Sequence, residues 1–471
     1  MAATPWWQGA MVYRLDPARF QDSGAVGRGD LAGIIQRMDY LQSLGVDALL
    51  LDDVHPADPA FEDLIRSASQ HHLRLLLTVT PAMQRGDPQA ALGTVHGWLS
   101  AGIAGVYLPQ TEVGGVEREN SAFPGELAAL LRSFPGGRML LTGNAATVPA
   151  RSLPRRTASP AFLAGGPGGV WTLRADLPGN QPDASAARAA LVAISTPPSP
   201  GTVSLLSFAG DPPTISANAV AEAALLLTSR SGALFDFGDE IGLATNTVPP
   251  SAKEARTVMQ WTPTNIQGPE PAPIERVSPA KPDDGAIYGP YRPYVHPPPT
   301  RLTGSPPAAP HVTVDGNIPA ALPDPDTLPG FTTGHLPAAP VDGDRVNVAV
   351  EERDPHSILN AYRQLIALHH GNPTLRDGAE TVLNRDGQNA VVWIRRAPAG
   401  SRTAADVVGA VNLGDAPVVL TLDADLAAIG MGRGPLRPLF TFGARPMTGE
   451  TTHELRLPPH GVFLGEVTRR R

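Results

Sequence analysis

The residues best placed to do chemistry are the polar side chains that follow short apolar segments of β type. In a barrel of alternating strands and helices, the ends of such strands open onto the active site. Asp52 and Asp53 follow the apolar run Val46 to Leu51 in this way. Two adjacent carboxylates could divide the roles of general acid and general base. A solvated loop start with helix-capping aspartates explains the pair more simply, and we favour that interpretation.

A second apolar segment gives the opposite signal. A helix end at Gly97 to Ala101 runs into the β-type segment Ile103 to Leu108, which stops at Pro109. An enzyme would place a charged catalytic group where this strand ends, whereas this chain carries Tyr107 and Pro109. The segment therefore predicts a strand end without acid–base chemistry.

The elements that position these ends alternate along the first part of the chain. Nearly continuous apolar runs are typical of parallel strands buried on both faces, and segments with apolar residues at helical spacing lie between them. This order indicates a parallel sheet covered by helices. The expected strands are Met11 to Leu15, Val46 to Leu51, Leu73 to Val79, Ile103 to Leu108, Met139 to Leu141, Val203 to Phe208 and Ala233 to Phe237. The expected helices are Leu31 to Leu44, Phe61 to Ala68, Ala90 to Leu99, Leu127 to Leu131, Ala219 to Leu227 and Ser357 to His370.

The composition changes farther along the chain. Between Asn144 and Val203 the pattern weakens, and from Thr262 to about Asp344 proline, glycine and small residues dominate. The second stretch indicates an extended loop without a core of its own. From residue 376 onward, short β-type runs separated by turns predict a small β domain. We therefore divide the chain into residues 1–375, with a Pro-rich insertion at about 262–330, and residues 376–471.

The composition excludes several classes of function. The net charge of −8 and the lack of a long basic run give nucleic-acid binding no electrostatic support. The chain has no cysteine, which excludes disulfides and thiolate chemistry. We see no signal peptide and no apolar stretch of about 18 residues, the length of a membrane span. These features predict a cytoplasmic protein.

Several motifs, taken together, resemble the α-amylase family of glycoside hydrolases, family 13. The resemblance is closest to the glucosidase and trehalose-synthase branch. It implies an α/β fold: a (β/α)8 TIM barrel in degenerate form, followed by a C-terminal antiparallel β-sandwich, in a family that acts on α-glucosidic bonds with retention. The matching segments are Trp6-Trp7, Val12-Tyr13, Phe20 to Asp22, Gly29 to Leu31, Asp39 to Leu41, Leu44 to Ala48, Phe237 to Gly242, Arg256 to Trp261, Gly330 to Gly334 and Asp354 to Leu359.

The resemblance breaks at the catalytic positions. Retaining hydrolysis requires a carboxylate nucleophile and a carboxylic acid about 5 Å apart. The family takes them from the fourth and fifth strands, with an arginine two residues before the nucleophile. At the matching positions this chain has Tyr107 for the arginine, Pro109 for the nucleophile and Asn144 for the acid. The resemblance therefore implies that the catalytic pair is lost.

The third strand has lost its polar signature as well. Thr78, Ala82 and Met83 stand where the family has an aspartate, an asparagine and a histidine. Asp211 is the one expected carboxylate that remains, without its usual histidine neighbour. A capping or turn role before two prolines explains Asp211 more simply than catalysis.

A metal or cofactor is not expected either. Asp22 and Asp30 remain of the family's calcium-type loop, but Gly24 and Ala25 replace oxygen ligands, and calcium needs 6–8 of those. No glycine-rich motif has the spacing of a nucleotide site. The side chains of the adjacent pairs His71-His72 and His369-His370 are expected on the surface, and those of Trp98 and Trp261 in the core.

The chain also lacks room for domain B, the loop domain that family enzymes insert after the third strand. Thr78 and Ala101 are too close in sequence for it, and Val54 leads almost directly to Phe61. Both features resemble the ectodomain of the heavy-chain subunits of heteromeric amino-acid transporters, which are catalytically silent relatives. Those subunits carry a membrane helix and a linking cysteine, and this chain has neither. The resemblance thus supports a loss of activity without a transporter partner.

Two further features of the sequence could form functional sites. Arg174 and Asp176 repeat the arginine–x–aspartate spacing, but no glutamate follows at a strand end, and Glu222 lies inside an apolar helix. We do not favour a relocated catalytic pair. The Pro-rich insertion leaves from the rim that would hold the active site, and it either covers the barrel or docks a partner, or it is a loop without a role. Its aromatic candidates are Tyr288, Tyr291, Tyr294 and His296.

From the sequence alone we favour a pseudoenzyme that binds a protein partner or an α-glucan. The alternative is a glycoside hydrolase or transglycosidase, similar to an α-glucosidase or trehalose synthase, that uses Asp211 and helpers we do not recognise.

Overall fold

The structure is a computed structural model. It describes residues 6–80, 82–83, 86–109, 123–143, 174–178, 184–195, 205–209, 218–230, 232–243, 258–262, 330–331, 346–383, 389–401, 404–443 and 449–467.

Eight parallel strands form the first sheet, in the order β5-β4-β3-β2-β1-β8-β7-β6. This is the order of a (β/α)8 barrel in which β8 returns to pair with β1. Among the described residues, no strand pairing joins β5 to β6. The strands are β1 (Met11–Leu15), β2 (Ala48–Leu51), β3 (Arg74–Thr78), β4 (Gly105–Pro109), β5 (Met139–Gly143), β6 (Arg174–Pro178), β7 (Leu205–Ala209) and β8 (Gly232–Asp236).

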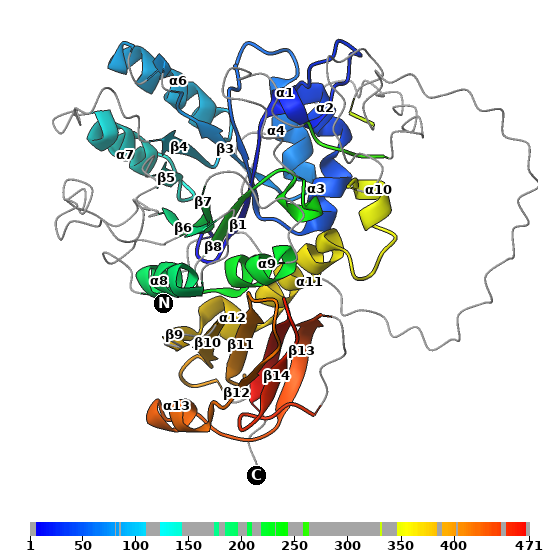
Figure 1. Ribbon diagram of the computed structural model, residues 1–471. Coiled ribbons are helices and arrows are strands. Elements are labelled where there is room, and N and C mark those ends of the chain that lie inside the picture. The colour runs from blue at the N-terminus through cyan, green and yellow to red at the C-terminus, as the bar shows by residue number, and fades with distance from the viewer. Residues whose placement is uncertain are drawn as a thin grey trace, which may run out of the picture.

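Helices follow most of these strands and cover the outside of the sheet (Figure 1). The expected helix from Leu31 to Leu44 is divided at Arg37, where the backbone leaves the helical region. Gly45 ends the second piece with φ of 86°, a conformation that favours glycine. The helices are α1 (Pro17–Phe20), α2 (Leu31–Gln36), α3 (Met38–Leu44), α4 (Phe61–Gln70), α6 (Pro88–Ser100), α7 (Phe123–Ser133), α8 (Ala184–Ser195), α9 (Ala219–Thr228), η2 (Asp239–Ile241), α10 (Val348–Glu351), α11 (Ile358–Gly371) and α12 (Pro373–Asp377).

The C-terminal part is a β-sandwich. A five-stranded antiparallel sheet has the order β13-β15-β11-β10-β9, and a two-stranded sheet pairs β12 with β14. Their apolar side chains share one core cluster. Trp393 lies across Gly409, where a Cβ atom would come within 2.2 Å of the indole ring, so only glycine fits. The elements are β9 (Ala379–Leu383), β10 (Ala390–Arg396), β11 (Val407–Asn412), β12 (Val418–Leu420), α13 (Asp423–Ala428), β13 (Leu436–Phe442), β14 (Leu455–Leu457) and β15 (Val462–Val467).

Helices α8, α9, α11 and α12 lie between the barrel and the C-terminal sheet (Figure 1). Every residue of α9 is buried, as expected for a helix packed on all sides. His369 of α11 is fully buried here, so the expectation of a surface histidine is wrong for this residue. The predicted core positions of Trp98 and Trp261 are confirmed, each being 2% exposed.

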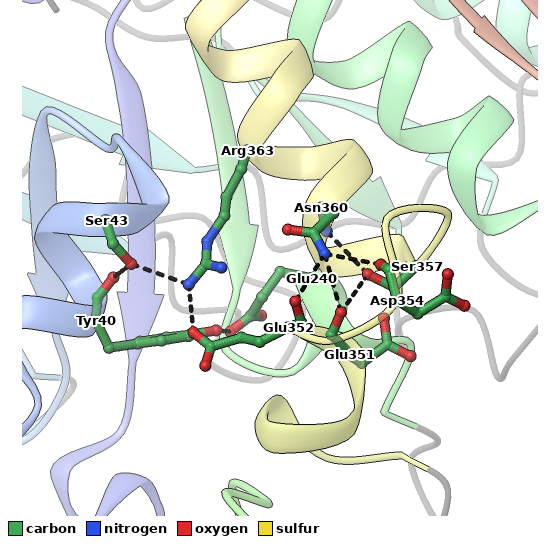
Figure 2. A network of polar contacts seen from close by, with 9 residues as sticks. All are labelled: Tyr40, Ser43, Glu240, Glu351, Glu352, Asp354, Ser357, Asn360 and Arg363. Carbon is green, nitrogen blue, oxygen red and sulfur yellow. Dashed lines mark hydrogen bonds and ion pairs between the residues drawn. The ribbon is translucent and has the colours of Figure 1, made fainter. Parts of the chain in front are cut away.

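A polar network joins α3, α10 and α11 beside the barrel (Figure 2). The Arg363 guanidinium donates to Ser43 Oγ at 2.9 Å and to Glu352 at 2.7 Å. The Asn360 amide donates to the carbonyl oxygens of Glu351 at 3.0 Å and of Asp354 at 2.8 Å. These bonds fix the turn that leads into α11, because they satisfy carbonyl groups at the end of α10.

Replacing Asn360 with alanine is expected to lower the free energy of unfolding by about 1 kcal/mol, because water replaces only part of the lost hydrogen bonds. Urea denaturation of the full chain measures the change. Gln364→Ala, at an exposed position of the same helix, is the matched control and should change stability by less than about 0.5 kcal/mol. Equal losses in the two variants would contradict a role for Asn360 in holding the turn.

Candidate functional site at the C-terminal ends of the barrel strands

The interior of the barrel is built from alternate residues of its strands, because successive side chains of a strand point to opposite faces. Met11, Tyr13 and Leu15 belong to the large core cluster, while Val12 belongs to a separate one. The separate cluster fills the barrel interior with side chains from several strands, namely Val12, Ala48, Leu50, Leu76, Tyr107, Met139, Leu141 and Leu234. Residues two positions farther along β1, β2, β3 and β8 therefore reach the C-terminal end of the interior.

The residues at these positions are polar, and we call them, together with Tyr107 of β4, the polar layer. Four of them lie in strands β1, β3, β4 and β8, and the fifth directly follows β2. The polar layer consists of Arg14, Asp52, Thr78, Tyr107 and Asp236.

The centre of the polar layer is an ion pair. Arg14 Nε donates to Asp52 Oδ2 at 2.8 Å, and Thr78 Oγ1 donates to Asp52 Oδ1 at 2.5 Å. Each carboxylate oxygen of Asp52 thus accepts one hydrogen bond. The expected helix-capping role of Asp52 is wrong, because the side chain bonds across the strand ends instead. Asp53, next to it, is exposed and has a positive φ of 50°.

Arg14 interacts with two further members of the polar layer. Its Cζ atom lies 5.8 Å from the centre of the Tyr107 ring, within the range of a cation–π contact. Burial lowers the pKa of Arg14, but the carboxylates of Asp52 and Asp236 outweigh burial and hold this pKa above its ordinary value. The guanidinium is therefore a permanent cation between two acidic side chains.

The positions singled out on β3 and β4 lie at this end of the barrel. Tyr107 is buried in the interior cluster, and Pro109 is the last residue of β4, on the same face of the strand. Thr78 is the last residue of β3. Ala82 and Met83 lie beyond β3, exposed and partly buried respectively. In the described strand β4, no carboxylate occurs between Gly105 and Pro109.

Other candidates lie outside the described residues. These are Asn144, Asp211, Tyr288, Tyr291, Tyr294 and His296, with most of the Pro-rich insertion. Arg174 and Asp176 fall on β6, which begins directly after the β-like run Trp171 to Leu173 of the sequence.

The loop before α2 uses its aspartates within the fold. Asp22 accepts from the backbone N–H groups of Gly24 and Gly27, at 2.9 and 2.7 Å. Asp30 caps α2 by accepting from Gly33 N–H at 2.6 Å. Within the described ranges, no three histidine, aspartate or glutamate side chains are arranged to hold a metal ion. No described helix is long and apolar enough to cross a bilayer.

A second acidic side chain lies on the helix-covered face of the sheet, away from the polar layer. Glu240 is fully buried and accepts from the hydroxyl of Tyr13 at 2.6 Å. It also accepts from the hydroxyl of Tyr40 at 2.7 Å (Figure 2). Tyr13 points to the helix-covered face of β1, as its core cluster shows. Glu240 therefore ties β1 and α3 to the segment after β8, which is a structural role.

Sequence reasoning missed Arg14 and the role of Asp236. Both are charged residues near the C-terminal end of an otherwise apolar strand. They occupy the face of the strand opposite to the residues that belong to the large core cluster. A charge at an inward position near a strand end is the signal that could have identified them.

The sequence comparisons match short parts of the chain. The model of the α-amylase catalytic domain matches residues 14–60. Probable oligo-1,6-glucosidase 2 of Bacillus subtilis (strain 168) is 46% identical over 54 residues, which are 12% of this chain and 10% of that protein. Trehalose-6-phosphate hydrolase of the same organism is 32% identical over 124 residues, covering 22% of this chain and 21% of that protein. The matches thus span about a tenth to a fifth of these relatives.

Solved structures resemble the chain over almost its whole length. Trehalulose synthase from Pseudomonas mesoacidophila MX-45 superposes with a TM-score of 0.68 at 14% identity, covering 99% of this chain and 100% of that one. The α-glucosyl transfer enzyme XgtA gives 0.65 at 18% identity, with the same coverage. The likeness is one of fold, and it confirms the predicted barrel with its C-terminal antiparallel β domain.

The family match lies at the start of the barrel, and the relatives that match in part are named as a glucosidase and a trehalose-6-phosphate hydrolase. The chain is therefore similar to the α-amylase catalytic domain over residues 14–60, and its fold is that of the trehalulose synthase and XgtA structures.

Proposed function

We propose that this protein binds α-glucosides at the C-terminal end of its barrel. The observation that carries the proposal is the polar layer, whose central pair is Arg14 with Asp52, because it places hydrogen-bonding side chains where barrel enzymes hold their substrates. The names of the relatives point to the same ligand class, since they describe glucosidases, a trehalose-6-phosphate hydrolase and glucosyl-transferring enzymes.

The comparisons favour cleavage or transfer of the bound glucoside. The relatives and structural neighbours named above are described as a glucosidase, a trehalose-6-phosphate hydrolase, a trehalulose synthase and an α-glucosyl transfer enzyme. They support the alternative drawn from the sequence, an α-glucosidase or transglycosidase, better than the pseudoenzyme interpretation. In this form of the proposal Asp211 interacts with the bound sugar, and the acid and nucleophile come from residues that the family motif does not identify.

A specific observation favours a second candidate, binding without cleavage. Strand β4 ends in Pro109, and Tyr107 occupies the inward position two residues before it. A proline cannot attack an anomeric carbon, and retaining chemistry needs two carboxyl groups about 5 Å apart. In this form the protein holds an α-glucan or a protein partner. The expected absence of domain B supports this form, because only nine residues, 79–87, separate β3 from α6.

Glucose release from maltose, isomaltose and trehalose distinguishes the two forms. If the enzyme form holds, release is measurable and Asp211→Asn lowers it by at least about 100-fold, the scale of a lost catalytic group. Asp415→Asn is the control, because this side chain is 99% exposed in the C-terminal domain. Binding heat without release would establish the second form. Absence of both heat and release would contradict the proposal that the barrel binds α-glucosides.

A further inference from the structure

His369 of α11 is a titratable side chain in the corner where the barrel meets the β domain. It is 0% exposed, and neither ring nitrogen has a hydrogen-bond partner of good geometry among the described residues. The chain before β1 closes over one edge of the ring, because a Cβ atom at Gly9 would lie only 3.2 Å from His369 Nε2. Burying two ring nitrogens without partners is costly, which distinguishes this histidine from a side chain that only fills space.

The cationic groups around the ring come from three elements. His370 is the next residue of α11, with its ring centre 5.8 Å from that of His369. Arg376 approaches from α12, since its Cγ atom would lie 3.9 Å from the same Cβ position at Gly9. Arg395 approaches from β10 and is itself 0% exposed. A proton on the ring would therefore add a charge beside two permanent cations.

The acidic groups of this corner are engaged by the same arginines. Glu380 of β9 lies 3.8 Å from Arg395 Nη1. Asp377 of α12 accepts from Arg376 at 2.9 Å. Helix α9 faces the ring with an uncharged group, the carbonyl of Leu227, which favours the protonated ring. This carbonyl is the main group in the corner that opposes the effect of the cations.

Burial and the basic neighbours together decide the charge of the ring. Burial lowers the pKa of His369 far below its ordinary value, and His370, Arg395 and Arg376 lower it further. The ring is therefore neutral while the corner is closed. A histidine exposed to water takes up a proton near pH 6.5. The open form gains that proton, so the closed corner loses stability as the pH falls below this value.

We propose that His369 is an acid-sensitive latch between the barrel and the β domain. At neutral pH the uncharged ring lets α9, α11, α12 and β10 pack against one another. When the corner opens in mild acid, the ring takes up a proton and cannot return beside Arg376 and Arg395 without losing it. The latch concerns the contact between the two domains and does not depend on what the barrel binds.

A single cysteine measures the opening, because the chain has no cysteine of its own. Ser229→Cys places a thiol directly after α9, at a position that is 0% exposed. Its rate of reaction with 4,4′-dithiodipyridine is measured at pH 7 and pH 5, with native His369 and with His369→Gln. Comparing the two chains at the same pH cancels the titration of the thiol and of other groups such as Glu222.

The ratio of the rate with native His369 to the rate with His369→Gln should rise by about 25-fold from pH 7 to pH 5, because the open ring titrates near pH 6.5 and the closed ring stays neutral. His369→Leu, with an apolar side chain, should give the same result. His96→Gln, at an exposed position of α6, should leave the response of the native chain unchanged. A ratio that changes by less than about twofold would overturn the latch.

A thiol away from the corner separates local opening from unfolding of the whole chain. Ala68→Cys in α4 lies at a position that is 1% exposed. The same ratio of rates should stay constant for this thiol between pH 7 and pH 5. An equal rise for Ala68→Cys and Ser229→Cys would mean that His369 acts on global unfolding, and it would overturn the latch.

Discussion

Arg395→Met is expected to lower the free energy of unfolding by about 3–5 kcal/mol, the cost of breaking a buried ion pair by removing one partner. The side chains of Arg395 and Glu380 are both 0% exposed, with Arg395 Nη1 3.8 Å from Glu380 Oε2. Arg395 also donates to the carbonyl oxygens of Thr228 and Gly378, each at 3.0 Å. The pair thus joins the end of α9 to β9 and β10. Denaturant unfolding, monitored on the full chain, measures the loss.

The pKa of Arg395 reflects two opposing effects, the burial of its charge and the attraction of Glu380. Burial lowers the pKa to about 10, and Glu380 partly opposes this effect. A cation is therefore costly to hold here, and its loss leaves the Glu380 charge in the same buried place. The double variant Arg395→Met with Glu380→Gln should be more stable than Arg395→Met alone, because it removes that charge.

Arg396→Met is the matched control for this prediction, because Arg396 is the next residue of β10 and is exposed. It should change stability by less than about 0.5 kcal/mol. If Arg395→Met were equally mild, or if the double variant were the least stable of all, the pair would not carry the junction between the barrel and the β domain.

The parts of the fold that could be predicted are those with large apolar side chains. Strands β2 and β3 are apolar on both faces because one face fills the barrel and the other contacts helices. Helix α8, which follows β6, could not be predicted, because half of its residues are alanine and it carries no stripe of large apolar residues. The weak pattern between 144 and 203 therefore hid this helix of the barrel.

The site could be predicted only in part, because only the residues at positions that match the family's motifs stand out in the sequence. Matching positions drew attention to Pro109 and Thr78, the last residues of β4 and β3, and to Tyr107, two residues before the end of β4. Arg14 matches no expected catalytic residue, and its partner Asp52 comes from another strand. A contact between residues 38 apart in sequence has no local signal, so the pair became visible only when the sheet order was known.

Glu222 is the clearest local conflict in the sequence, a carboxylic acid in a helix that is otherwise apolar. In the structure it is 3% exposed, and neither carboxyl oxygen has a hydrogen-bond partner among the described residues. Burial raises the pKa of Glu222 to about 8. The side chain is therefore protonated in the folded protein near neutral pH. Burial and the neighbouring carboxylate of Asp236 raise the pKa of Asp239, whose Oδ1 atom has no hydrogen-bond partner among the described residues.

The Glu222→Gln variant is expected to gain stability relative to the native chain as pH rises. An unfolded glutamate loses its proton near pH 4.3, whereas the folded one keeps it to about pH 8. Between these values folding takes up a proton, so the native chain loses stability with rising pH, by about 1.4 kcal/mol per pH unit, and glutamine does not. Urea unfolding at pH 5 and pH 9 should show the difference between variant and native chain growing by about 4 kcal/mol. Glu62→Gln, at an exposed position of α4, should show no such growth. A difference that stays constant from pH 5 to pH 9 would mean that Glu222 is ionised in the fold, and that α9 tolerates a buried charge.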